Sequence, residues 1–117
     1  MKKIWHLGSC STCQRIIKEL QLEAKGFAMQ DIKTESITEE QLATMKEAAG
    51  SYEALFSRRA MKFRGMGLHE RTLAETDYQQ LILEEYTFLK RPVIQVDDQF
   101  FVGNTKKVIA AAAEALT

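Results

Sequence analysis

The chain has 117 residues, 45% of them hydrophobic, and its 16 lysines and arginines are balanced by 16 aspartates and glutamates. This length suits one domain, and the balanced charge gives no basis for bulk binding to nucleic acid or to an acidic membrane surface. No apolar run approaches the roughly 20 residues of a spanning helix, and only a strand-length apolar stretch follows Lys2-Lys3, so we expect a cytoplasmic protein.

The N-terminal part of the sequence predicts a strand, a loop and a helix in succession. Residues 3–7 are apolar and β-prone, and Gly8-Ser9 follows them. From Thr12 onward, apolar residues recur at three- and four-residue spacing until Gly26, a natural C-cap, which predicts a helix with one buried face. The apolar positions of that face are Ile16, Ile17, Leu20 and Ala24. We expect this helix to pack on a sheet.

The middle of the sequence predicts one more strand and then several helices. Residues 27–32 alternate as a strand, and residues 38–41 are typical of a capped helix start whose helix ends at Gly50. Residues 51–64 continue at helical spacing, and residues 76–85 form another short helix. The expected buried positions of these helices are Leu42, Met45, Ala49, Tyr52, Leu55, Phe56, Met61 or Phe63, Leu81 and Ile82.

The C-terminal part predicts a hairpin and a last helix. Residues 93–96 and 99–102 form two strands joined by Asp97-Asp98, and we expect Asn104 to cap an alanine-rich helix that runs to Leu116. The element order predicts a single α/β domain over residues 1–117. Its helical insertion, at about residues 38–88, separates an N-terminal βαβ part from a C-terminal ββα part.

The two cysteines, Cys10 and Cys13, lie where the first strand passes into the first helix. A thiolate is the reactive form of cysteine, and the start of a helix points free N–H groups and a positive dipole end at Cys10, so its pKa should fall. Cys13 lies one turn later on the same face, close enough to attack a mixed disulfide formed at Cys10. The pair therefore suits a nucleophile and a resolving cysteine.

Two other interpretations of the pair stay open at this point. Cys13 could be a small buried hydrophobe beside an incidental loop thiol at Cys10, since free cysteine is often buried for packing alone. Zinc binding with His6 as a third ligand lacks a second Cys/His pair, so we expect no metal. The strand-to-helix context favours redox chemistry.

Several separate motifs resemble the arsenate reductase (ArsC)/Spx family of thioredoxin-like proteins. Ile4-Trp5-His6 followed by Gly8-Ser9-Cys10-Ser11-Thr12-Cys13 resembles that family's first strand and active-site loop. Leu55-Phe56-Ser57-Arg58-Arg59 is similar to its helical insertion, and Leu89-Lys90-Arg91-Pro92-Val93-Ile94 resembles its Arg-Pro step before a hairpin. The resemblance covers nearly the whole chain and implies a thioredoxin-like fold, βαβα-ββα with the helical insertion.

The resemblance also implies roles for individual residues. Cys10 would be the nucleophile, Arg91 and Arg59 would stabilise negative charge beside it, with Arg58 as a register alternative to Arg59, and Pro92 would be cis beside Cys10. A guanidinium suits such a site because it carries a permanent charge and two parallel donors. The residues expected at the substrate are Pro92, Ser11, Thr12 and His6, a histidine that some arsenate reductases carry near the nucleophile.

The resemblance implies a thiol-disulfide redox protein without a bound cofactor. Glutathione, glutaredoxin or thioredoxin would return Cys10 and Cys13 to the reduced state, and nothing in the sequence demands more than a monomer. Two departures argue against arsenate as substrate. Gln14 stands where many relatives carry a basic residue, and Val102-Gly103-Asn104 stands where arsenate reductases usually bring in a third arginine.

An alternative function follows from the Spx side of the resemblance. Cys13 at the second cysteine position is more typical of Spx than of arsenate reductases, and Gly50 matches a glycine at the Spx surface that contacts the α subunit of RNA polymerase. The cysteine pair would then be a redox switch on a transcriptional regulator, with no turnover. A glycine between two helices is also the ordinary C-cap, so Gly50 needs no partner to explain it.

Overall fold

The computed structural model describes residues 1–117, which divide into two compact units. The first unit comprises Met1–Glu35 and Arg91–Thr117, and the second comprises Ser36–Lys90. The second unit spans the helical insertion expected at about residues 38–88. No helix is long and apolar enough to cross a membrane.

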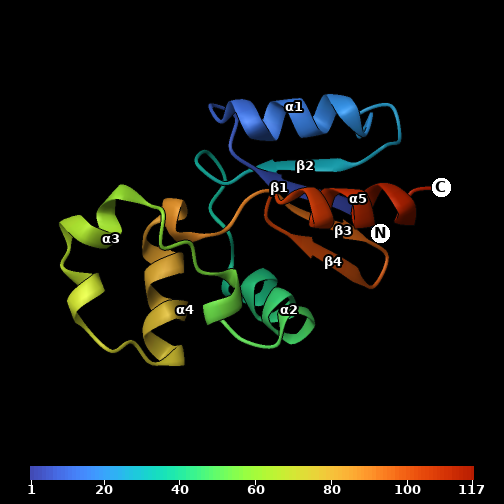
Figure 1. Ribbon diagram of the computed structural model, residues 1–117. Coiled ribbons are helices and arrows are strands. Elements are labelled where there is room, and N and C mark those ends of the chain that lie inside the picture. The colour runs from blue at the N-terminus through green and yellow to red at the C-terminus, as the bar shows by residue number, and fades with distance from the viewer. The chain divides into compact units, whose positions relative to one another are not determined.

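The first unit contains a four-stranded sheet and two helices (Figure 1). In chain order these elements are β1 (Lys2–His6), α1 (Ser11–Glu19), β2 (Ala28–Asp31), β3 (Val93–Val96), β4 (Gln99–Val102) and α5 (Lys106–Ala115). The strand order is β2-β1-β3-β4, with β1 parallel to β2 and antiparallel to β3, and β3 antiparallel to β4. This βαβ and ββα arrangement is the expected thioredoxin-like fold.

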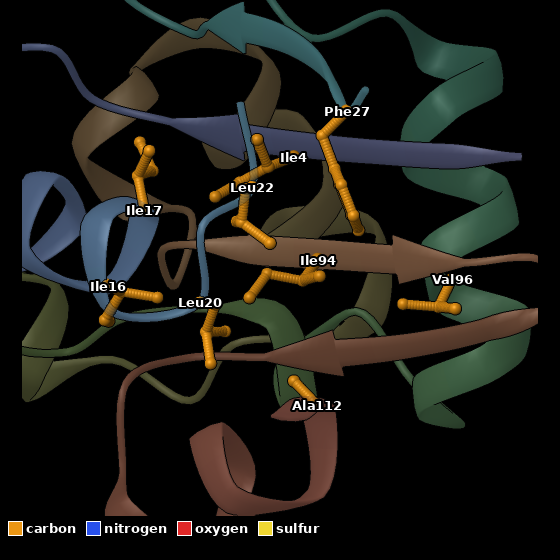
Figure 2. Close-up of a cluster of buried hydrophobic side chains, with 9 residues drawn as sticks. All are labelled: Ile4, Ile16, Ile17, Leu20, Leu22, Phe27, Ile94, Val96 and Ala112. Atoms are coloured by element: carbon orange, nitrogen blue, oxygen red, sulfur yellow. The ribbon is translucent and has the colours of Figure 1, made fainter. Parts of the chain in front are cut away.

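Both helices of the first unit pack on one face of the sheet. Ile4 of β1 is paired with Ile94 of β3, so the two side chains lie on the same face, and both are fully buried. Figure 2 shows Ile16 of α1 and Ala112 of α5 in the same cluster. Burying the apolar face of α1 fixes the helix on the sheet, and with it the position of the loop that leads into the helix.

The second unit is helical. Its elements are α2 (Glu39–Ala49), α3 (Met61–Gly65), α4 (Glu75–Glu84) and three 3-10 helices, Glu53–Leu55, Leu68–Glu70 and Tyr86–Phe88. Its core centres on Phe56, whose ring centroid lies 4.9 Å from that of Phe88 and 4.9 Å from that of Tyr78. The helix α2 begins and ends as predicted, with a capping box between Thr38 and Gln41 and a left-handed Gly50.

The prediction of a helix up to Gly26 was wrong, because α1 ends at Glu19. The chain turns at Gln21, which has a φ of 54°, and Leu22 is then fully buried in the core of the first unit. A continuing helix would place Leu22 on the side opposite Leu20, away from that core. Burial of Leu22 therefore favours the turn over the helix, and Ala24 is exposed.

The prediction of a continuous helix over residues 51–64 was also wrong. The N–H of Ser57 donates to the carbonyl of Phe88 at 2.6 Å, and the N–H of Lys90 donates to the carbonyl of Leu55 at 2.8 Å. These bonds require extended backbone, so the segment breaks into a 3-10 helix and α3. Met61 is 93% exposed, whereas Phe63 is partly buried.

The last helix has a different cap from the one predicted. Thr105, not Asn104, is the N-cap of α5, and its hydroxyl accepts a hydrogen bond from the N–H of Val108 at 3.2 Å. Both residues have side chains that suit an N-cap, so the sequence alone did not distinguish them. The hairpin pairs Val102 with Val93, and the helix begins after the short segment that follows Val102.

This assignment predicts different effects for two neighbouring substitutions. Thr105→Ala should lower the free energy of unfolding by about 1 kcal/mol, because the N–H of Val108 loses its acceptor. Asn104→Ala, the matched control, should change it by less than about 0.5 kcal/mol, as exposed positions usually do. Urea denaturation followed by circular dichroism measures both. An equal or larger loss for Asn104→Ala would contradict the assignment.

Candidate active site

The position of Cys10 follows from the packing of α1 against the sheet. After β1 the chain turns so that the N–H of Cys10 donates to the carbonyl of Leu7 at 3.0 Å. Cys10 is the N-cap of α1, with extended backbone, and its carbonyl accepts the N–H of Gln14 at 3.1 Å. The side chain of Cys10 therefore stands where the first amides of the helix lack partners inside the helix.

The pKa of Cys10 lies below its ordinary value. Partial burial of the thiol raises the pKa, but several groups that favour the thiolate together outweigh it. These are the backbone amides of Cys13 and Thr12, the thiol of Cys13, and the positive charge of Arg91. Hydrogen bonds and a cation stabilise the charged form of a thiol, so Cys10 is the more nucleophilic of the two cysteines.

The pKa of Cys13 shifts in the opposite direction, to about 11. Burial is the main cause, since Cys13 has no exposed surface. The hydrogen bond to Cys10 and the negative charge of the Cys10 thiolate raise the pKa further, against the backbone amide of Leu7 and the charge of Arg91, which lower it. Both cysteines are free, and because their pKa values shift in opposite directions, Cys10 loses its proton at a lower pH than Cys13.

Arg91 and Pro92 lie immediately before β3. Arg91 acts electrostatically on both sulfurs. The Arg91–Pro92 peptide bond is cis, as the resemblance implies, and Pro92 is buried. The carbonyl of Pro92 accepts the N–H of Gly103 at 2.9 Å, which ties this step to the end of β4. Gly103 itself has a φ of 94°, a left-handed conformation that favours glycine.

The remaining site residues predicted in this unit lie around the same loop. Ser11 is exposed at the first position of α1, and Thr12 is partly buried behind it. His6 ends β1, and its ring Nδ1 is buried without a hydrogen-bond partner. No three His, Cys, Asp or Glu side chains are grouped so that they could hold a metal ion.

Arg59 and Gly50 belong to the second unit. Arg59 is exposed, and its role beside the thiols stays a prediction. The register alternative, Arg58, is bound within the unit, to Glu53 at 2.7 Å and to the hydroxyl of Tyr78 at 2.8 Å. Gly50 has a φ of 97° at the C-cap of α2, which accounts for the glycine, so binding of RNA polymerase there stays a prediction too.

Sequence reasoning missed one residue at the cysteine loop, Asp31. This last residue of β2 accepts the N–H of Gly8 on its carboxylate at 3.2 Å. Gln14, which sequence comparison marked only as a missing positive charge, donates from its side-chain amide to the carbonyl of Gly8 at 3.3 Å. The available signal was a polar residue at the carboxyl end of a strand parallel to β1, since such ends meet at one edge of a sheet.

A βαβ unit with two cysteines at the start of its helix, completed by a ββα unit with a cis-proline, defines a thioredoxin-like protein with a thiol site. The chain belongs to the ArsC family, whose sequence profile matches residues 5–112. The family expected from the sequence motifs is thereby confirmed. Membership supports a thiol redox function. A comparison with curated proteins gives no match.

Several solved structures share the fold of this chain. A protein named YFFB is 21% identical, with full coverage of both chains and a TM-score of 0.82. An arsenate reductase from Vibrio cholerae is 15% identical over 94% of this chain and 95% of its own, with a TM-score of 0.79. An arsenate reductase related protein from Brucella melitensis is 22% identical over 94% and 92%, with a TM-score of 0.72. At these identities the likeness establishes the fold alone.

The charge of Arg91 predicts a measurable change in the reactivity of Cys10. Arg91→Met should raise the pKa of Cys10, because the cation that favours its thiolate is lost, whereas Arg91→Lys should preserve much of the effect. Lys90→Met, the control, removes the same charge one residue earlier and should leave the pKa unchanged. The pH dependence of alkylation by iodoacetamide measures all three. An equal rise in Lys90→Met would show that only net charge matters.

Proposed function

We propose that the protein is a thiol-disulfide redox protein in which Cys10 attacks and Cys13 resolves. The observation that carries the proposal is the opposite shift of two thiol pKa values within one helical turn, downward at Cys10 and to about 11 at Cys13. A pair of this kind separates the nucleophile from the resolving cysteine, because Cys10 forms a thiolate at a lower pH than Cys13 does.

In the first step, the Cys10 thiolate attacks one sulfur of a substrate disulfide. A bond forms between Cys10 and that sulfur, the substrate S–S bond breaks, and the other substrate sulfur leaves as a thiolate. Arg91 balances the negative charge before and during the attack, since its charge acts on both cysteine sulfurs. Pro92 would line the adjacent edge where the substrate chain approaches.

In the second step, Cys13 attacks the Cys10 sulfur of the mixed disulfide. Two causes of the high Cys13 pKa, the Cys10 charge and the hydrogen bond to Cys10, vanish once Cys10 is in a disulfide. The Cys13 thiol can then lose its proton to solvent, form the Cys10–Cys13 bond and release the first substrate sulfur as a thiolate. The substrate gains two electrons, and the protein pair loses them.

An external thiol would return the pair to the reduced state by the reverse exchange. Glutathione, glutaredoxin or thioredoxin supplies two electrons of the required kind, and no bound cofactor is needed. Resemblance alone supports a further cationic role for Arg59. It also disfavours arsenate as substrate, because Gly103 and Asn104 stand where arsenate reductases usually bring an arginine. We therefore favour a disulfide or a glutathione adduct as substrate.

Trapping of a mixed disulfide tests the assignment of the two cysteines. With a glutathionylated peptide, Cys13→Ser should accumulate a covalent adduct at Cys10, because the resolving sulfur is absent. Cys10→Ser should form no adduct, and the unmodified protein should release the thiol and form the Cys10–Cys13 bond. Mass spectrometry of acid-quenched samples distinguishes the three. An adduct on Cys13 in Cys10→Ser, formed as fast as the adduct on Cys10, would sink the assignment.

The pH dependence of the first step follows from the Cys10 pKa. The rate of adduct formation should rise with pH through the lowered pKa of Cys10 and then level off while Cys13, with a pKa of about 11, stays protonated. Stopped-flow measurement from about pH 4 to 9 covers this range. A rate that still rises tenfold per pH unit up to pH 9 would contradict a lowered Cys10 pKa and the proposed function.

The preference for a disulfide over arsenate has its own test. With glutathione and glutaredoxin present, turnover of arsenate should be at background level, whereas a glutathionylated substrate should be reduced. Asn104→Arg, which adds the cation, serves as a gain-of-function variant, and Asn104→Gln is its neutral control. Consumption of NADPH through glutathione reductase measures both reactions. Efficient arsenate turnover by the unmodified protein would reverse the preference.

A further inference from the structure

Both backbone polar groups of Gly8 are bound by side chains from different elements. Its N–H donates to Oδ2 of Asp31, at the end of β2, at 3.2 Å. Its carbonyl accepts the Nε2 amide of Gln14, in α1, at 3.3 Å. Gly8 is exposed, so neither bond is needed to cover a buried polar atom.

The carboxylate of Asp31 is itself held in place. Asp31 is paired with His6 where the parallel strands β2 and β1 end, and its Oδ1 accepts the N–H of Lys33 at 3.0 Å. Its backbone carbonyl accepts the N–H of Glu35 at 2.8 Å. A side chain fixed at both ends in this way offers Gly8 an acceptor at a defined position on the sheet.

The carboxylate of Asp31 leaves no room for a side chain at Gly8. A Cβ added to Gly8 would lie 2.5 Å from Oδ2 of Asp31 and 3.5 Å from its Cγ. At no other glycine of the chain would an added Cβ meet an atom within 4 Å. Gly8 is also not among the residues with positive φ, so its backbone conformation does not demand glycine. Close approach of Asp31 accounts for this glycine.

We propose that Asp31 is a positioning residue for Cys10. Gln14 of α1 supports the same role by binding the carbonyl of Gly8, whose N–H is bound by Asp31. Asp31 anchors Gly8 to the end of β2, and Gly8 is two residues from the nucleophile, so the anchor sets where the sulfur stands relative to the amides of Thr12 and Cys13. Asp31 does not touch the substrate in this role. The inference rests on the proposed function, in which the Cys10 thiolate reacts.

The charge of Asp31 and its positioning role have opposite effects on Cys10. A nearby negative charge disfavours a thiolate, so an aspartate acting only through its charge would raise the pKa of Cys10, and its removal would lower that pKa. An aspartate that aligns the loop has the reverse effect, because its loss weakens the amide contacts that favour the thiolate. The sign of the change therefore separates the two roles.

The test measures the pKa of Cys10 in Asp31→Ala and in the nearly isosteric Asp31→Asn. Iodoacetamide alkylation across pH, with the adduct located by mass spectrometry, gives the value. Asp31→Ala should raise the pKa by about 0.5 to 1 unit, about a three- to tenfold loss of thiolate at a fixed pH below the pKa. Asp31→Asn keeps one acceptor oxygen and should fall between. Asp98→Ala, which removes an exposed carboxylate in the hairpin turn, is the charge control and should cause no rise.

Coupling between Gly8 and Asp31 provides a second measurement. Gly8→Ala should raise the Cys10 pKa in the unmodified chain, because its methyl group displaces the carboxylate. In the Asp31→Ala background the same change should add little, since the space is already vacant. Additive effects of the two substitutions would overturn the inference.

The outcomes distinguish this inference from the function on which it rests. An ordinary Cys10 pKa in the unmodified protein would contradict the proposed function. The difference in Cys10 pKa between that protein and its Asp31 variants would still test the positioning role of Asp31. A lowered or unchanged pKa in Asp31→Ala and Asp31→Asn, with melting temperatures showing that both fold, would overturn the positioning role. If Asp31→Ala does not fold, Asp31→Asn and Gly8→Ala decide the question alone.

Discussion

The site depends on the position of the Cys10 sulfur beside the free N–H groups at the start of α1. The first amides of any helix lack partners within the helix, and the helix dipole adds a positive potential there. What holds α1 at this position is burial of Ile16 and Ile17 against the strands. The apolar face of the helix thus fixes the position of the N-terminus that carries Cys10.

The difference between the two thiols comes mainly from burial. Cys10 caps the helix at a partly exposed position, whereas Cys13, one turn further along, is enclosed. The same thiol group therefore loses its proton more readily in one place than in the other. Arg91 is distant from the cysteines in sequence, but it lies just before β3, which pairs with β1. Its charge therefore acts on both cysteine sulfurs.

Local pattern predicted the elements whose boundaries are set by neighbours in sequence. The capping box at Thr38, the glycine at the end of α2 and the hairpin around Asp97 all depend on residues within a few positions, and the structure confirms them. The failures occur where distant backbone competes. Leu22 leaves the helical path to enter the core, and Leu55 pairs with Lys90, which no helical periodicity could reveal.

The sequence by itself determined the family, the order of elements and the two cysteines at a strand-to-helix junction, because these depend on local motifs and on spacing along the chain. Only the tertiary structure decided which groups act on them. Asp31 reaches Gly8 because β2 runs parallel to β1, and Arg91 acts on the sulfurs because β3 joins the same sheet. Contacts between strands far apart in sequence arise from sheet register, which residue spacing alone does not specify.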